Sequence, residues 1–152
     1  MDFQTPRWVG ELMISRVEGD PRTILEPTPG EGKLIEVITY RYPEAKIENF
    51  CPPSFADGIE EVDYIIANPP FTPMKLGYSM LEQFFEWSGN IIVLMPWLAV
   101  INSERRTQRY LEKGLKEVIH LPRRAFPGAR VQTCIMVFKR GYQGEINLGF
   151  AK

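Results

Sequence analysis

The sequence predicts an α/β protein in which a mostly parallel central sheet is covered by helices on both faces. Short, nearly continuous apolar runs alternate with segments whose apolar residues recur at helical spacing. Apolar strands of this kind are typical of parallel sheets that are buried on both faces. Segments rich in proline and glycine separate the runs and predict turns.

The first elements follow from local signals near the amino terminus. Residues 8–17 are expected to form an amphipathic helix, with Thr5 as its N-cap and Pro6 as its first helical residue. A short buried strand at 23–25 and a helix at 33–40 come next. The segment between them contains two prolines and two glycines, which exclude regular structure there.

The rest of the chain continues the alternation. The further strands expected are residues 46–50, 62–67, 90–95, 118–121 and 132–138, and the further helices are residues 76–87 and 103–113. Ser103 is the expected N-cap of the last helix, with Glu104 in its first turn. Residues 145–149 are expected to pair with the strand at 132–138 through a turn that contains Gly141 and Gly144.

The size and the composition set limits on the class of protein. A chain of 152 residues has the usual size of one domain, so we expect residues 1–152 to form a single domain without a separate target-recognition domain. Two cysteines, Cys51 and Cys134, fit a reduced cytoplasmic interior and argue against a zinc site. The longest apolar run, residues 91–95, is too short to span a membrane. No metal site is expected.

The charges are unevenly distributed along the chain, although the net charge is only −1. Residues 1–103 carry 7 basic and 15 acidic side chains, whereas residues 104–140 carry 10 basic and 3 acidic ones. A basic segment suits a nucleic acid, because each contacted phosphate releases a counterion. The alternative is an ordinary solvated surface on two helices and a loop.

The loop after the first strand has the features of a ligand-binding turn. Ligands of open α/β sheets bind at the carboxyl ends of the strands. Gly30 and Gly32 allow close approach of the backbone, and Glu26 could accept hydrogen bonds from a cationic or hydroxyl group. Because Glu31 would oppose a phosphate at the helix start, a nucleotide pyrophosphate fits less well than a less anionic cofactor. An ordinary strand-to-helix turn is the alternative.

The tetrad Asn68-Pro69-Pro70-Phe71 is the strongest signal in the sequence, because it directly follows a buried strand. Two consecutive prolines fix two φ angles and remove two backbone donors. The result is a stiff rim that exposes carbonyl oxygens, one side-chain amide and an aromatic ring.

Such a rim suits a planar amine or amide nitrogen, whose delocalised lone pair makes it a poor nucleophile. Asn68 Oδ1 and the Pro69 carbonyl could accept hydrogen bonds from the two N–H groups and favour a tetrahedral nitrogen, while Phe71 stacks on the ring. This is preorganised electrostatic catalysis that needs no titrating base. A rigid turn that only ends the strand is the alternative.

Five segments, in their order along the chain, resemble the S-adenosylmethionine-dependent amino-methyltransferases, most closely the DNA adenine-N6 methyltransferases. They are Thr5-Pro6, the loop from Glu26 to Gly32, the tetrad from Asn68 to Phe71, residues 93–97, and residues 126–134. The resemblance covers most of the chain, and the tetrad is its most specific part. It implies a Rossmann-like methyltransferase fold, S-adenosyl-L-methionine as cofactor, and methyl transfer to N6 of a flipped adenine in DNA.

The resemblance also assigns roles to residues. The catalytic residues would be Asn68, Pro69, Pro70 and Phe71, and the cofactor-binding residues would be Thr5, Pro6, Glu26, Pro27, Thr28, Gly30 and Gly32. Phe126 would lie beside the target base. Arg123, Arg124 and Arg130 flank the same loop, so we expect them to contact phosphates.

The chain departs from the family between Gly32 and Asn68, which only 35 residues separate. The family usually fits two strands and a helix there, whereas this chain offers one strand candidate, so we expect a sheet shortened at this edge. Glu48 could bind the cofactor ribose if residues 46–50 are the second strand. Glu48 or Asn49 could face the cofactor adenine if they are the third, and Asp57 is another candidate.

Three functions remain open from the sequence. The first is methylation of adenine in DNA, with sequence specificity supplied by short loops, a homodimer or a specificity subunit. The second is methylation of an RNA base or of a glutamine amide in a protein, because the same acceptors serve an amide. The third is a non-catalytic subunit that binds the cofactor or nucleic acid. His120, the only histidine, is expected to be a hydrogen-bonded side chain at a strand end.

Overall fold

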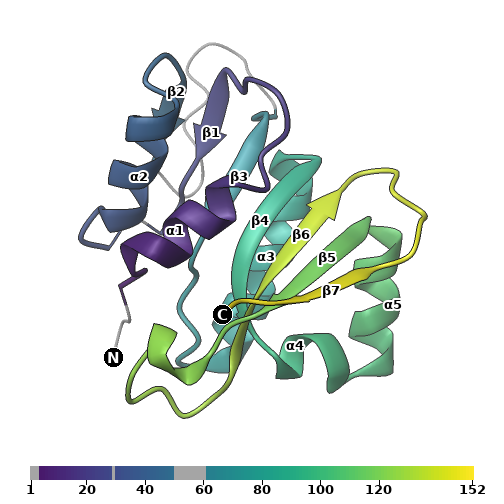
Figure 1. The fold of residues 1–152 in the computed structure, drawn as a ribbon. Coiled ribbons are helices and arrows are strands. Elements are labelled where there is room, and N and C mark those ends of the chain that lie inside the picture. Colours follow the sequence, from purple (N-terminus) through teal and green to yellow (C-terminus); the bar gives the residue numbers. More distant parts are fainter. Residues whose placement is uncertain (1–3, 29, 50–60) are drawn as a thin grey trace.

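A computed structural model describes residues 4–28, 30–49 and 61–152 (Figure 1). Its strands are β1 (Thr23–Leu25), β2 (Lys46–Glu48), β3 (Tyr64–Ala67), β4 (Asn90–Pro96), β5 (Leu115–His120), β6 (Thr133–Lys139) and β7 (Asn147–Phe150). Its helices are α1 (Arg7–Ile14), α2 (Lys33–Arg41), α3 (Met74–Trp87), α4 (Leu98–Ile101), α5 (Glu104–Glu112) and the 3₁₀ turn η1 (Arg123–Ala125). Each element expected from the sequence is present, β1 with the expected ends and the others with shifted ends, and α4 and η1 are additional.

The seven strands form one sheet in the order β2-β1-β3-β4-β6-β5-β7. The pairs β1–β2, β1–β3, β3–β4 and β5–β7 are parallel. Only β6 runs antiparallel to its neighbours, β4 and β5. The predicted α/β class with a mostly parallel sheet is therefore confirmed.

The expected hairpin between residues 132–138 and 145–149 is wrong. Strand β6 lies between β4 and β5, so both of its edges already carry hydrogen-bonded partners. Strand β7 instead pairs in parallel with β5, with Val118 opposite Leu148 and His120 opposite Phe150. The connection after β6 therefore crosses β5 before the chain rejoins the sheet.

Helices cover both faces of the sheet, as expected (Figure 1). Alternate residues of a strand point to opposite faces. Ile24, Ile66 and Ile92 pack with α1 and α2 on one face. On the other face, Leu25, Ile65 and Val93 pack with α3, α4 and α5. None of the helices in the described part of the chain has the length and apolarity that a membrane crossing requires.

Strand β2 is the outermost strand on the side of β1 among the described residues. Its residues pair directly with β1, with Leu25 opposite Glu48. Of the two places considered for residues 46–50, β2 therefore takes that of the second strand, directly beside the first. No further described strand lies beyond it, so the described sheet is shortened at this edge. Asp57 lies outside the described residues.

The two expected N-caps differ in outcome. Ser103 caps α5, because its hydroxyl accepts a hydrogen bond of 3.2 Å from the Arg106 backbone nitrogen. Thr5 does not cap α1, where Pro6 is the N-cap residue and no side chain provides a capping hydrogen bond. The Thr5 hydroxyl bonds a residue after β3 instead.

Candidate active site

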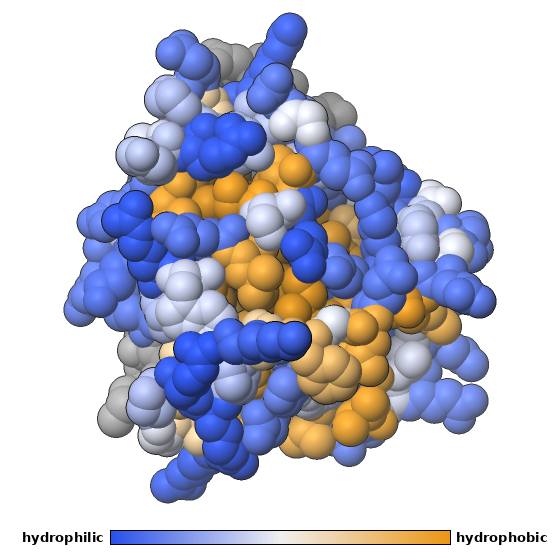
Figure 2. All heavy atoms as spheres, viewed as in Figure 1, coloured by the Kyte–Doolittle hydropathy of each residue, from blue (hydrophilic) through white to orange (hydrophobic). Residues whose placement is uncertain are grey.

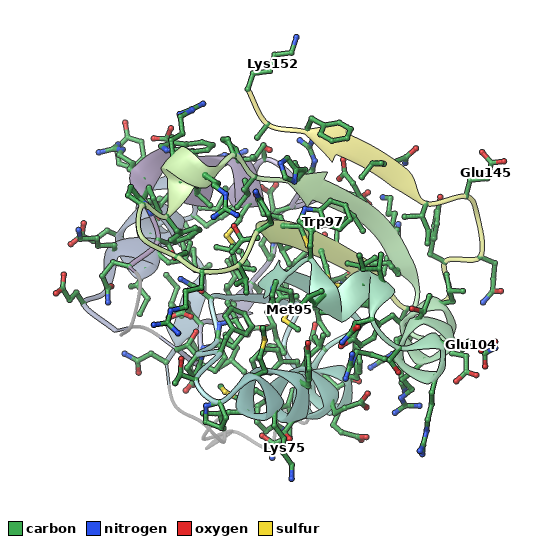
Figure 3. All side chains as sticks on the ribbon, turned by 90° about the horizontal axis from the view of Figure 1, so that it is seen from below. Lys75, Met95, Trp97, Glu104, Glu145 and Lys152 are labelled. Carbon is green, nitrogen blue, oxygen red and sulfur yellow. The ribbon has the colours of Figure 1, made fainter. Side chains whose placement is uncertain are left out.

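A cavity of about 860 Å³ opens at the carboxyl ends of the parallel strands. Four segments that are distant in sequence line it: the residues before α1, the loop after β1, the tetrad after β3, and the loop before β6. The tetrad and the glycine loop thus border the same space, which is the arrangement that methyl transfer between them requires. Seen from this end of the molecule, Met95 at the end of β4 lies near the centre (Figure 3).

Asn68 donates hydrogen bonds to two other segments that line the cavity, the loop after β1 and the residues before α1. Its backbone nitrogen donates to the Thr28 hydroxyl at 3.2 Å, and its side-chain Nδ2 donates to the Thr5 hydroxyl at 3.0 Å. The second bond directs the amide nitrogen toward α1. Pro69 is buried, whereas Pro70 and Phe71 are partly exposed, and all three line the cavity.

Thr28 connects the tetrad to the end of β1. Its hydroxyl donates to Glu26 Oε1 at 2.8 Å, and its backbone nitrogen donates to the same oxygen at 3.1 Å. Because the hydroxyl also accepts from Asn68, a continuous chain of hydrogen bonds runs from Glu26 through Thr28 and Asn68 to Thr5. This chain fixes the loop after β1 and the tetrad relative to each other.

Glu26 lies beneath the loop and is fully buried. Burial raises the pKa of its carboxyl from 4.5 to about 7, although the two bonds from Thr28 act in the opposite direction. Its second oxygen, Oε2, is buried and has no hydrogen-bond partner among the described residues. Glu26 therefore supports Thr28 from below and does not itself line the cavity.

The glycine loop reaches the cavity at Gly30, which has a φ of 52°. An added methyl group there would lie 2.8 Å from Nε2 at the end of the Gln4 side chain, and the positive φ strains any residue with a side chain. Gln4 also accepts a hydrogen bond of 3.1 Å from the Glu31 backbone nitrogen. Gly32 is the N-cap of α2 with a φ of 83°.

The other candidate cofactor residues lie outside the cavity lining. Pro27 is buried, and Pro6 borders a separate groove between α1 and α2. Glu48 ends the edge strand and lies 3.5 Å from Lys46 Nζ, and Asn49 is exposed just after it. The structure thus brings Thr5, Thr28 and Gly30 to the tetrad but does not bring Glu48 or Asn49 there.

The loop before β6 forms the opposite side of the cavity. Phe126 is buried and lines the cavity together with exposed Arg130. Arg123 donates to the Ala129 carbonyl at 3.4 Å, and the Arg124 guanidinium lies 4.7 Å from the centre of the Trp8 ring. Arg123 and Arg124 are exposed beside the cavity and do not line it.

Carboxylates of the described residues pair with four of the ten cations of the basic segment. The salt bridges are Arg109–Glu82, Lys116–Glu18, Lys139–Glu18 and Arg140–Glu61. Among the described residues, no carboxylate forms a salt bridge with Arg123, Arg124 or Arg130. The cations of this segment that lack a carboxylate partner among the described residues therefore include the three on the loop at the cavity.

Sequence reasoning missed several residues of the cavity. They are Gln4, Leu34, Thr72, Met74 and Met80, whereas Leu94, Gly128, Ala129, Val131 and Thr133 belong to the segments 93–97 and 126–134 that carry the resemblance. Most are neighbours of predicted residues on the same segments, so their proximity in sequence was an available signal. Met80 has no such signal, because only the packing of α3 brings it there. Apolar and hydrophilic surface lie side by side on the face drawn in Figure 2.

His120 is hydrogen-bonded at its strand end, as expected. Trp97 Nε1 donates to His120 Nδ1 at 2.6 Å, and the His120 ring also lies 5.6 Å from the Phe150 ring centre. Neither Trp97 nor His120 lines the cavity. The part of the chain that the structure describes holds no group of three or more residues able to ligate a metal ion.

Comparison with models of protein families and with curated proteins finds no match to this sequence. Solved structures do match the fold. A modification subunit attributed to a type I restriction enzyme of Vibrio vulnificus YJ016 has a TM-score of 0.72 and 15% identity, over 95% of this chain and 45% of that subunit. A protein of Listeria monocytogenes described as a class I S-adenosylmethionine-dependent methyltransferase has a TM-score of 0.72 and 14% identity, over 97% of this chain and 65% of that protein.

A third neighbour, the 23S rRNA methyltransferase ErmE, has a TM-score of 0.59 and 13% identity, over 95% of this chain and 72% of that one. The chain spans less than two thirds of the length of the first two neighbours. Together with the order of the sheet, these likenesses show that the chain has the Rossmann-like fold of class I S-adenosylmethionine-dependent methyltransferases. The fold implied by the sequence motifs is confirmed.

Proposed function

We propose that this protein transfers a methyl group from S-adenosyl-L-methionine to the N6 amine of adenine in DNA. The observation that carries the proposal is the shared cavity, in which the tetrad and the glycine loop meet. Hydrogen bonds through Thr28 and Thr5 hold Asn68 in a fixed position there. Positioning of this kind is the main requirement when the methyl donor is already activated.

The residues at the cavity fit this cofactor. Gly30 leaves room beside the backbone, and the hydroxyls of Thr5 and Thr28 supply polar groups. When bound, S-adenosylmethionine supplies a methyl group on a sulfonium that leaves as a neutral thioether. Glu48, at the end of β2, is the candidate for the ribose, because β2 holds the place of the second strand.

The tetrad makes the amine nitrogen a better nucleophile. Asn68 Oδ1 and the Pro69 carbonyl accept hydrogen bonds from the two amine hydrogens and make the nitrogen lone pair available. The lone pair forms the new nitrogen–carbon bond as the carbon–sulfur bond breaks, and the nitrogen then releases one proton to solvent. Phe71 stacks on the base and keeps the amine in line.

The charge pattern favours a nucleic acid over a protein as substrate. Arg130 lines the cavity, and Arg123 and Arg124 lie beside it on the same loop. None of the three forms a salt bridge with a described carboxylate, and we assign them to phosphates. DNA is preferred to RNA because the tetrad most closely resembles that of the DNA adenine enzymes. Sequence specificity would come from a second copy of the chain or from a specificity subunit.

Transfer of labelled methyl groups tests the proposal. The protein is incubated with labelled cofactor and DNA, RNA or a glutamine-containing protein in parallel, and we expect label on adenine in DNA. The Asn68→Ala variant should lose turnover and keep its affinity for the cofactor in calorimetry. Label on RNA or on protein instead would overturn the DNA assignment. A folded protein that binds no cofactor would favour a non-catalytic subunit.

A further inference from the structure

Gly77 of α3 lies directly against the aromatic ring of the tetrad. A methyl group added at Gly77 would lie 2.7 Å from Phe71 Cδ1, 2.8 Å from Phe71 Cε1 and 3.0 Å from the Pro70 carbonyl oxygen. These separations are shorter than van der Waals contact between carbon atoms, which is optimal at about 3.5–4.0 Å. The absence of a side chain at Gly77 therefore determines where the ring can lie.

Glycine at this position is unfavourable for the helix itself. Gly77 is the fourth residue of a helix of 14 residues and is buried, and glycine within a helix is less stable than alanine. The close packing of Phe71 offsets this loss, because an alanine would occupy the space that the ring now fills. The residue type at position 77 is thus explained by contact with the tetrad and not by helix formation.

The Phe71 ring borders both helix α3 and the cavity. One side of the ring contacts α3 at Gly77, and the ring also lines the cavity. Phe126 lines the same cavity from the loop before β6. A ring displaced from α3 would have to move by about 0.8 Å to regain a separation of about 3.5 Å. The cavity is the open space that Phe71 borders, so such a movement narrows the cavity.

We propose that Gly77 is a positioning residue that sets how far the Phe71 ring extends into the cavity, and so leaves room for a planar ring. This inference rests on the proposed function, in which a flipped base stacks on Phe71. A planar group stacked on Phe71 needs this space beside the ring.

The test compares Gly77→Ala with Gly10→Ala. Gly10 is a buried glycine in α1 where an added methyl group meets its nearest atoms at 3.4 Å, which is ordinary contact. For Gly77→Ala we expect kcat/KM on DNA adenine to fall roughly 10- to 100-fold, since displacements near 1 Å have effects of this size. Cofactor affinity should remain within about twofold, because the glycine loop is untouched. Gly10→Ala should leave both quantities unchanged.

A double-mutant cycle separates a positioning role from a general structural one. In a Phe71→Ala background, Gly77→Ala should have no further effect on kcat/KM, because the ring it displaces is gone. An equal loss in both backgrounds, or no loss in either, would overturn the inference. A crystal structure of Gly77→Ala gives a readout independent of substrate. A ring that stays in place contradicts the inference, whereas a displaced ring in a protein inactive on adenine supports it while the proposed function fails.

Discussion

The hydroxyl group of Thr28 links the loop after β1 to the tetrad after β3. Its oxygen donates to Glu26 and accepts from the backbone nitrogen of Asn68, 40 residues further along the chain. The tetrad could be predicted from the sequence, because local proline chemistry makes it distinctive. The bonds that orient Asn68 could not, because they come from Thr28 and Thr5, which only the folded sheet places beside β3.

Replacing Thr28 by valine tests this connection. Valine keeps the shape and removes the hydroxyl, which leaves the partly buried Asn68 backbone nitrogen without its acceptor. We expect a loss of about 1–3 kcal/mol in the free energy of unfolding and a fall in kcat of roughly 10-fold or more as Asn68 shifts. Denaturant unfolding and single-turnover methyl transfer measure the two effects. Thr39→Val, an exposed position of α2, is the control and should change neither.

Glu26 makes stability depend on pH. Burial raises the pKa of its carboxyl from 4.5 to about 7 in the folded protein. Between these values the folded state binds more protons than the unfolded state, so stability falls as pH rises through this window and is then constant. The whole change is about 3 kcal/mol for a shift of this size, at about 1.4 kcal/mol per pKa unit.

The Glu26→Gln variant tests this dependence, because it replaces the carboxyl with a neutral group of the same shape. The variant should lose the pH dependence and be more stable than the wild type at pH 8. Denaturant midpoints of both proteins from pH 4 to pH 8, in the absence of cofactor, provide the comparison. Parallel pH curves for the two proteins would show that Glu26 is not the responsible group.

At the scale of elements, the sequence predicts each strand and helix more reliably than it predicts their pairing. Apolar runs and prolines mark β3 and β4 locally, and both are found. The place of β7 depends on which sheet edge is free, and the local pattern carries no information about that. Because β6 lies between β4 and β5, the following strand β7 cannot pair with it.

The N-cap of α5, which the sequence predicts, should contribute measurably to the free energy of unfolding. Ser103 accepts a hydrogen bond from the Arg106 nitrogen, and Glu104 follows in the first turn. Ser103→Ala should lower the free energy of unfolding by about 0.5–2 kcal/mol. Gln108→Ala, at an exposed position of the same helix, should leave it unchanged or raise it slightly. Equal stability of the two variants would mean that the cap contributes nothing.

At the scale of the whole molecule, charge along the sequence differs from charge on the folded surface. The segment 104–140 is strongly basic, yet acidic residues from the first part of the chain pair with several of its cations. The sequence correctly indicates an excess of positive charge there. Only the fold shows that no described carboxylate forms a salt bridge with the loop arginines beside the cavity, whereas Glu18, Glu61 and Glu82 pair with other cations of the segment.

This distribution predicts which cations bind DNA. Each phosphate contact contributes about 0.9 to the slope of log affinity against log salt concentration. Replacing Arg123, Arg124 and Arg130 by alanine should therefore weaken DNA binding and reduce the slope by about 2 to 3. The matched control replaces Lys116, Lys139 and Arg140, which changes the net charge equally but removes cations already paired with Glu18 and Glu61. It should alter the slope by less than about 1. Equal slopes for the two triple variants would show that net charge alone, and not the loop beside the cavity, holds the nucleic acid.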